Sequence, residues 1–274
     1  METRSIGLIS GEGEFPLILA RTLKKQGYEV VAVCFSKEQK GKLVPLVDKV
    51  EEIGIGQLGK LISVFRKEQI RDLVFLGKID KSKALKIGIP DLKAFFLWKR
   101  LKNREDNAIL KAVVEELEKE GFKVRGPAEF LGEFLTPEGV LSKRIPNEEE
   151  WEDIKYGFFI AKKIGALDIG QCVVVKNKMT VAVEAMEGTD ATILRAGSLK
   201  KDTVVVKVAK PIQDLRLDLP VVGFKTIENL VKAKAKVLAL EAEKTFFLQQ
   251  EKALELADKH GIVIIGYRGE NGET

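Results

Sequence analysis

Short apolar runs alternate with amphipathic helical patterns along the first third of the chain. The runs 5–10, 28–35 and 72–76 are rich in aliphatic and β-branched residues and predict buried strands. The segments 17–26 and 59–69 carry apolar residues at helical spacing. Because parallel strands need crossover helices, this alternation predicts a doubly wound parallel sheet, as in a Rossmann-like N-terminal domain.

The second half of the chain has a different pattern. Three β-branched runs follow one another with short turns between them, as in hairpins, at 172–175, 180–185 and 203–209. Helical patterns and one last apolar run surround them, at 148–164, 227–239, 251–260 and 262–266. We therefore expect a C-terminal α/β domain with a mixed sheet.

The periodic pattern weakens between these two halves. A helical segment at 108–120 and an apolar run at 122–125 are followed by a stretch with Pro127, Pro137 and Pro146. Prolines and glycines of this density are typical of a connection between domains. We predict an N-terminal domain at 1–130, a linker at 131–146 and a catalytic C-terminal domain at 147–274.

Composition and charge restrict the class of protein. Hydrophobic residues make up 45% of the 274 positions, which is enough for two cores. The net charge of +5 is spread along the chain and suits an anionic substrate or membrane surface, but forms no dense stripe for nucleic acid. Cys34 and Cys172 lie in apolar runs, as expected of buried thiols in a reducing compartment.

The sequence contains neither a signal-peptide pattern at its start nor an apolar run of the roughly 18 residues that a membrane span needs. We therefore expect a cytoplasmic protein. The segment 92–102 (LKAFFLWKRLK) combines aromatic and basic residues, and two interpretations stay open. It is either a helix that touches the inner membrane or an acyl chain, or a core helix whose lysines reach solvent.

The sequence has one histidine, His260. A histidine-rich dinuclear metal site is thereby excluded, and a Ser-His-Asp relay is excluded unless His260 supplies it. Acid–base or metal chemistry must therefore use carboxylates, lysines and the backbone.

A glycine-rich turn, GEGEFP, follows the first predicted strand and begins a helix. Gly11 and Gly13 there allow an anion to approach the backbone N–H groups. The dinucleotide fingerprint is incomplete, since Pro16 replaces its third small residue and Ser36 and Lys37, not an acid, follow the second strand. Phosphate binding and a tight turn without a ligand remain equal alternatives.

Acidic residues gather in two segments of the second half, at 184–190 and 211–220. In an extended chain Asp214, Arg216 and Asp218 would share one face. Carboxylates of this kind suit Mg²⁺, which neutralises a diphosphate while a further carboxylate activates water, and Arg195 and Arg216 offer donors for phosphate oxygens. The alternative is a set of salt bridges on a solvated edge strand.

These segments carry a family resemblance. Six motifs occur in the order and spacing of the LpxI family: 7–16 (GLISGEGEFP), 76–78 (LGK), 104–107 (REDN), 167–171 (LDIGQ), 183–190 (VEAMEGTD) and 211–223 (PIQDLRLDLPVVG). The chain resembles this family over residues 4 to 268. The resemblance implies hydrolysis of UDP-2,3-diacylglucosamine, assisted by Mg²⁺, to 2,3-diacylglucosamine 1-phosphate (lipid X) and UMP, a step of lipid A biosynthesis.

The resemblance also implies roles for individual residues. Asp218 is the strongest catalytic candidate, followed by Asp190, Glu187 and Arg216; Asp218 and Asp190 are the expected metal ligands. The expected substrate-binding residues are Gly11, Gly13, Gly77, Lys78, Asp106, Gln171, Gly188, Thr189 and Gln213.

Two other functions remain as alternatives. The Rossmann-like first half is compatible with a nicotinamide-dependent oxidoreductase, although Pro16 and the missing acidic residue weaken that interpretation. A carrier that binds a nucleotide or lipid without catalysis would use the same residues. Release of UMP that requires Mg²⁺ distinguishes the enzyme from the carrier.

Overall fold

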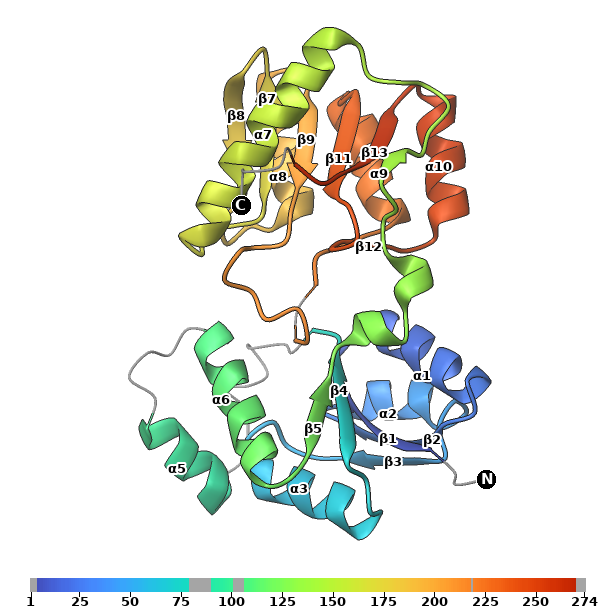
Figure 1. Ribbon diagram of the computed structural model, residues 1–274, viewed down its shortest axis with the longest axis vertical. Coiled ribbons are helices and arrows are strands. Elements are labelled where there is room, and N and C mark those ends of the chain that lie inside the picture. The colour runs from blue at the N-terminus through green and yellow to red at the C-terminus, as the bar shows by residue number, and fades with distance from the viewer. Residues whose placement is uncertain (1–3, 79–89, 101–105, 218, 270–274) are drawn as a thin grey trace. The chain divides into compact units, whose positions relative to one another are not determined.

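The computed structural model describes residues 4–78, 90–100, 106–217 and 219–269. The chain forms two compact units (Figure 1). Unit 1 comprises Met1–Gly132 together with Asp214–Asp218, and unit 2 comprises Glu133–Gln213 and Leu219–Thr274. No helix within the described ranges is long and apolar enough to cross a membrane.

Unit 1 contains a five-stranded sheet in the order β3-β2-β1-β4-β5. All neighbouring strands are parallel. The strands are β1 (Ser5–Ser10), β2 (Glu29–Cys34), β3 (Lys49–Glu52), β4 (Asp72–Leu76) and β5 (Lys123–Arg125). This strand order is that of a Rossmann-like sheet and confirms the predicted fold of the N-terminal half. Strand order reverses between β1 and β4, where such sheets bind ligands.

The helices of unit 1 follow its strands. They are α1 (Phe15–Lys25), α2 (Lys37–Leu43), α3 (Leu58–Lys67), α5 (Leu92–Arg100) and α6 (Asp106–Lys119), with a 3-10 turn, η1 (Pro127–Glu129), after β5. Helix α3 shows the packing: Leu61, Ile62 and Phe65 lie on one face and join the core formed with β1 and β4. Helix α2 and strand β3 were not predicted from the sequence, because both are short and rich in charged residues.

Unit 2 contains a six-stranded mixed sheet in the order β6-β13-β11-β9-β7-β8. The strands are β6 (Gly139–Val140), β7 (Cys172–Lys176), β8 (Met179–Val183), β9 (Val204–Lys207), β11 (Val237–Glu241) and β13 (Val263–Tyr267). Strands β9, β11 and β13 are parallel, whereas β7 is antiparallel to β8 and β9, and β6 to β13. The predicted mixed sheet is confirmed. A small parallel pair joins β10 (Val221–Val222) to β12 (Phe246–Phe247).

Helices cover both faces of this sheet (Figure 1). On one face α7 (Glu148–Ala166) packs on Val204, Val206 and their neighbours. The other face, which includes Val205, is covered by α8 (Thr189–Leu199), α9 (Phe224–Ala233) and α10 (Gln250–Lys259). Because successive residues of a strand point to opposite faces, each central strand contributes side chains to the cores on both faces of the sheet. A 3-10 turn, η2 (Gly132–Phe134), precedes β6.

The predicted helix at 227–239 is wrong in its second part. Helix α9 ends at Ala233, because Lys234 takes a left-handed conformation (φ 56°) that closes the helix. The apolar residues after it form β11, in the middle of the sheet. A short apolar run is compatible with either a buried helix or a buried strand, so its spacing alone did not distinguish them.

Candidate functional site

The predicted glycine-rich site of unit 1 lies where β1 and β4 end side by side. The N–H of Gly11 donates to the carbonyl of Leu76 at 2.8 Å, and Glu12 and Lys78 exchange backbone hydrogen bonds of 2.7 and 3.1 Å. A Cβ on Gly11 would lie 2.5 Å from the carbonyl carbon of Gly77, so this approach requires glycine. The four residues predicted in unit 1 from the glycine-rich and LGK motifs are therefore neighbours.

These hydrogen bonds restrict how the turn could bind a phosphate. The N–H groups of Gly11 and Glu12 already donate to carbonyls at the end of β4. They are therefore not directed at a ligand. Gly13 has a positive φ of 109°, with nothing within 4 Å of the position of a Cβ, and the side chain of Lys78 is exposed. An anion at this turn would have to bind groups such as these.

Gln39 is a residue of this region that the sequence analysis missed. It is fully buried in α2, and its Nε2 donates to Ser10 Oγ at 3.1 Å and to the carbonyl of Gly13 at 3.3 Å. Its Oε1 has no hydrogen-bond partner among the described residues. An orphaned buried acceptor costs free energy unless a water or ligand group donates to it. The only signal in the sequence was its place shortly after the second strand.

Arg216 occupies a turn of unit 1. The N–H of Leu217 donates to the carbonyl of Asp214 at 2.9 Å, so the extended conformation predicted for 214–218 is wrong over this part. The guanidinium of Arg216 donates to both carboxylate oxygens of Asp214, and its Nη1 donates to Glu118 at 2.7 Å. The hydrogen bond from Arg216 lowers the pKa of Asp214. A phosphate that binds Arg216 must therefore compete with two carboxylates.

The side chains of two predicted site residues lie outside the described part of the chain. Asp218, the strongest catalytic candidate, lies outside the described residues. Asp106 begins helix α6, but its side chain lies outside the described part of the chain. Gln213 is described: its Oε1 accepts a hydrogen bond from the N–H of Lys210 at 3.1 Å and so closes the turn after β9.

Several polar residues of unit 2 lie on the side of the sheet where the parallel strands β9, β11 and β13 end. We call this side the carboxyl-end edge. Lys207, the last residue of β9, lies opposite Cys172 of β7 and Leu240 of β11. The antiparallel strands β7 and β8 bring Gln171 and Glu184 to the same edge. Ligands of open α/β sheets bind at such an edge.

A buried hydrogen-bonded chain runs along this edge. Lys207 and Glu184 are 6% and 7% exposed, and the hydroxyl of Thr189 lies between them. Lys207 Nζ donates to Thr189 Oγ1 at 3.0 Å, and Thr189 Oγ1 donates to Glu184 Oε1 at 2.9 Å. Glu184 Oε2 accepts from the N–H of Gln171 at 3.3 Å. Gln171 contributes its backbone here, and its buried Oε1 has no partner within the described ranges.

Glu184 belongs to the acidic segment 184–190, but neither Glu184 nor Lys207 was predicted as a site residue. Lys207 interrupts the apolar run 203–209, where a lysine is usually expected to extend its charged end into solvent. The charge at the end of a buried strand was the only signal. It became informative once the strand order placed β9 in the middle of the sheet.

Asp190 lies in the first turn of α8, a helix that was not predicted. Gly188 precedes the helix in a left-handed conformation (φ 79°), and Thr189 is the first helical residue. Asp190 Oδ1 accepts from Thr226 Oγ1 at 3.3 Å, whereas Oδ2 receives no hydrogen bond from the described part of the chain. Asp190 therefore keeps one oxygen available for a ligand.

Glu187 has a local role in the structure. Its carboxylate accepts from Arg195 at 2.6 Å, from the N–H of Ala185 at 3.1 Å and from Thr192 Oγ1 at 3.3 Å. The hydrogen bond from Arg195 lowers the pKa of Glu187. These contacts join the turn after β8 to helix α8, so Glu187 is engaged in a way that Asp190 is not.

The carboxylate oxygens of Asp190 are compatible as ligands with Mg²⁺. The described ranges hold no group of three or more His, Cys, Asp or Glu side chains arranged for a metal. Mg²⁺ does not need such a group, because it binds through one or two carboxylates together with water and substrate phosphates. The half-engaged carboxylate of Asp190 fits one of these positions.

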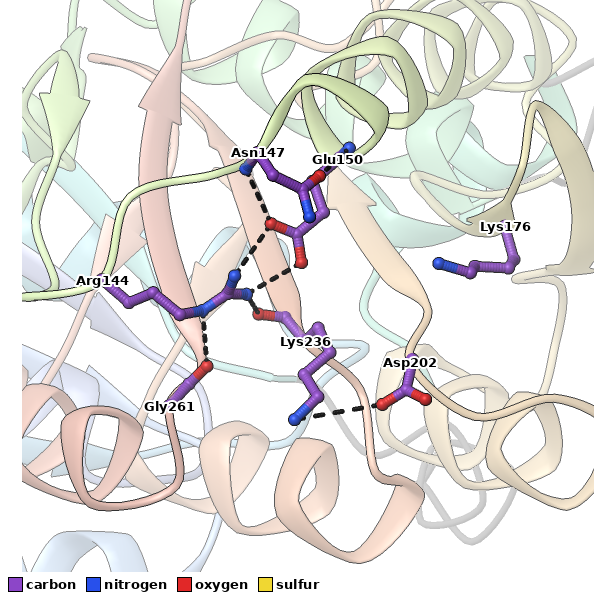
Figure 2. Close-up of a pocket in the computed structure, with 7 residues that line it drawn as sticks. All are labelled: Arg144, Asn147, Glu150, Lys176, Asp202, Lys236 and Gly261. Carbon is purple, nitrogen blue, oxygen red and sulfur yellow. Dashed lines mark hydrogen bonds and ion pairs between the residues drawn. The ribbon is translucent and has the colours of Figure 1, made fainter.

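A cavity of about 400 Å³ lies at the opposite edge of the same sheet (Figure 2). Arg144 donates there to both oxygens of Glu150 at 2.9 Å and to the carbonyls of Lys236 and Gly261. Asn147 caps α7 through the N–H of Glu150. These bonds tie the start of α7 to the starts of β11 and β13, and none of the predicted site residues lines this cavity.

Comparison with known proteins identifies the family. Residues 5–134 match the LpxI N-terminal domain, and residues 137–265 match the LpxI C-terminal domain. The chain belongs to the LpxI family. The UDP-2,3-diacylglucosamine pyrophosphatase LpxI of Caulobacter vibrioides is 32% identical to this LpxI family member over 277 residues, which cover 96% of this chain and 97% of the relative.

Similarity to solved structures adds nothing to this assignment. The biotin carboxylase domain of Hydrogenobacter thermophilus 2-oxoglutarate carboxylase shares 12% identity with a TM-score of 0.29. The match covers 85% of this chain and 41% of that chain. A score this low carries no argument about fold or function.

Proposed function

We propose that this LpxI family member hydrolyses the phosphoanhydride of UDP-2,3-diacylglucosamine to lipid X and UMP in lipid A biosynthesis. The observation that carries the proposal is 32% identity, over 96% of the chain, to a relative named for this activity. In the reaction a water oxygen bonds to the phosphorus nearer the diacylglucosamine, and the bond from that phosphorus to the bridging oxygen breaks. The bridging oxygen leaves on UMP, and the proton of the water passes to a carboxylate.

In this proposal the carboxylates of Asp190 and Asp218 act on the diphosphate. Asp190, through Oδ2, and Asp218 would hold Mg²⁺. The ion, when bound, offsets phosphate charge and supports attack by water. A carboxylate of this pair orients the water and accepts its proton. Arg216 stabilises the departing UMP after exchanging its contact with Glu118 for a phosphate oxygen.

Residues of unit 1 contribute substrate contacts in this proposal. Gly13 and Lys78 lie at the ends of β1 and β4, where strand order reverses and Rossmann-like sheets bind nucleotides. Lys78 is exposed and cationic, which suits a phosphate oxygen. Gly11 and Gly77 permit the close approach of the two strand ends that places these groups.

The proposal is tested by UMP release from UDP-2,3-diacylglucosamine by the purified protein. We expect release that requires Mg²⁺, stops on addition of EDTA and is nearly lost in Asp218→Ala and Asp190→Ala. Asp202→Asn, at the opposite edge of the sheet, is the matched control and should retain activity. Absence of UMP release by the wild type overturns the function. Near-normal turnover by a folded Asp218→Ala overturns the assigned site.

Metal binding is tested separately with Mn²⁺ as a paramagnetic substitute. Electron paramagnetic resonance should show bound Mn²⁺ in the wild type and in Asp202→Asn, and weaker binding in Asp190→Ala. Equal binding by all three proteins would contradict a metal site at Asp190, whatever the activities are.

We also propose that α5 contacts an anionic bilayer. Leu92, Phe95 and Phe96 are 75%, 51% and 59% exposed and share one helix face at i, i+3 and i+4 spacing. Exposed Lys99 follows one turn later. A helix with an apolar face and flanking cations is typical of interfacial binding, and the proposed substrate is itself a lipid.

The membrane proposal is tested by sedimentation with phosphatidylglycerol vesicles. The wild type should sediment with the vesicles, and Phe95→Ser combined with Phe96→Ser should remain in the supernatant. Met179→Ser replaces an equally exposed apolar side chain on β8 of unit 2 and should behave as the wild type. Equal sedimentation of both variants would overturn the role of α5.

A further inference from the structure

One buried lysine of unit 2, Lys207, connects the start of helix α8 to strand β10. Lys207 Nζ donates to Thr189 Oγ1 and to the carbonyl of Val221, each at 3.0 Å. In the sequence Thr189 immediately precedes Asp190, and Val221 follows Asp218 by three residues. These contacts of the ammonium are therefore to a neighbour of Asp190 in the sequence and to the strand that follows Asp218.

The strand pattern explains why Lys207 reaches these groups. In β9, Val205 faces the layer formed by α8 and α9, and Val204 and Val206 face α7. Lys207 is two residues after Val205 and so points to the same face. Helix α8 begins on that face with Thr189, and α9 follows β10. The side chain therefore lies between the starts of two segments that are 32 residues apart, Thr189 and Val221.

The directions of the hydrogen bonds fix the side chain of Thr189 between Lys207 and Glu184. An ammonium only donates, so the hydroxyl of Thr189 accepts from Lys207 and its own hydrogen goes to Glu184. Glu184 is in turn held by the N–H of Gln171. Burial of a lysine is costly unless such partners are present, and rotation of Thr189 would break two bonds at once. Gly188 offers no side-chain cap to α8, so the side chains of Lys207 and Glu184 fix the start of this helix through Thr189.

We propose that Lys207 is a positioning residue for the hydrolysis: it holds the start of α8, with Asp190, and the strand after Asp218 in the mutual arrangement that the reaction needs. This inference rests on the proposed function and deepens it. Lys207 acts through Thr189 and Val221. A displacement of about 1 Å in such a site is enough to lower a rate by about 100-fold.

The test is a double-mutant cycle on kcat with Lys207→Met and Thr189→Val. We expect Lys207→Met to lower kcat by about 100-fold with KM changed much less, since the substrate contacts remain. Thr189→Val removes the bridging hydroxyl without changing the volume, and should also lower kcat. Because both changes break one connection, the double variant should match Lys207→Met within about two-fold. Thr189→Ser, which keeps the hydroxyl, should recover most of the loss seen in Thr189→Val.

Lys176→Met is the matched control, because it removes a lysine from the opposite end of the neighbouring strand. It should leave kcat unchanged. A folded Lys207→Met with kcat within about three-fold of the wild type overturns the proposal. Losses that multiply in the double variant also overturn it, since they would show independent roles for Lys207 and Thr189.

Hydrogen–deuterium exchange tests the connection without reference to activity. Lys207→Met should accelerate exchange at the start of α8 and in β10 together, whereas Lys176→Met should change neither. Unchanged exchange in both segments overturns the inference. If the wild type released no UMP but exchange still changed in both segments, the proposed function would fail and the structural connection would stand. If Lys207→Met does not fold, hydrogen–deuterium exchange at the start of α8 and in β10 is measured on Thr189→Val instead.

Discussion

The ammonium of Lys162 lies 2.9 Å from both carboxylate oxygens of Glu241, and the two side chains are 11% and 3% exposed. Glu241 Oε2 also accepts from the N–H of Ala209 at 2.9 Å. Glu241 ends β11 on the face covered by α7, whereas Lys207 ends β9 on the opposite face. Two buried charges of opposite sign thus end neighbouring strands, and Glu241 fixes the start of the loop that follows β9.

Replacement of Glu241 should be strongly destabilising. Glu241→Gln leaves the ammonium of Lys162 buried without its carboxylate, which typically costs about 3–5 kcal/mol. Urea denaturation measures the change in the free energy of unfolding. Glu138→Gln alters an exposed carboxylate that pairs with Arg268 and should cost less than about 1 kcal/mol. A loss below about 1 kcal/mol for Glu241→Gln would contradict the structural role of this pair.

The pair of Asp214 and Arg216 should make stability depend on pH. The hydrogen bond from Arg216 lowers the folded-state pKa of Asp214, so the pair stabilises the fold above about pH 4, where aspartate in the unfolded chain is ionised. This contribution is lost as the pH falls below about 4, through the lowered pKa of the folded state.

The measurement is the urea midpoint of the wild type and of Arg216→Met, followed from neutral pH to about pH 2. The variant should be less stable at neutral pH, and the difference should shrink as the pH falls. A difference that stays constant over this range would show that the pKa of Asp214 does not depend on Arg216.

Two glycines of unit 1 should respond to alanine in opposite ways. Gly11→Ala places a Cβ 2.5 Å from the backbone of Gly77, and such overpacking typically costs about 1–3 kcal/mol. Gly41 lies in α2 with nothing within 4 Å of its Cβ position, so Gly41→Ala should stabilise by about 0.5–1 kcal/mol. Thermal unfolding compares them. Equal melting temperatures for the two variants would contradict the close approach of β1 and β4.

NAD should not raise the melting temperature. Strand β2 is followed by Phe35, Ser36 and Lys37, so the acidic partner of a dinucleotide ribose is absent, and Ser36 instead caps α2 through the N–H of Gln39. UMP, the proposed product, should raise the melting temperature as a ligand that binds the folded state. A shift with NAD and none with UMP would favour the oxidoreductase alternative.

The sequence alone determined the fold class of both halves and the position of most elements. Strands β1 and β4 have the predicted bounds, because buried parallel strands are continuous apolar runs that glycines end sharply. The order of motifs also identified the LpxI family. Where the pattern was short or charged, as in α2 and β3, or apolar without a clear period, as in β11, the same reasoning failed.

Only the tertiary structure decided which charged groups meet. Lys207, Thr189 and Glu184 lie in three different elements or turns, and their contact depends on the order and register of β7, β8 and β9. From the sequence Arg216 was expected to bind a phosphate oxygen and Glu187 to act as a catalytic carboxylate, whereas the folded chain pairs them with Asp214 and Arg195. The physical reason is that apolar burial follows from local periodicity, but the partner of a charge is set by the chain segments that folding brings to it.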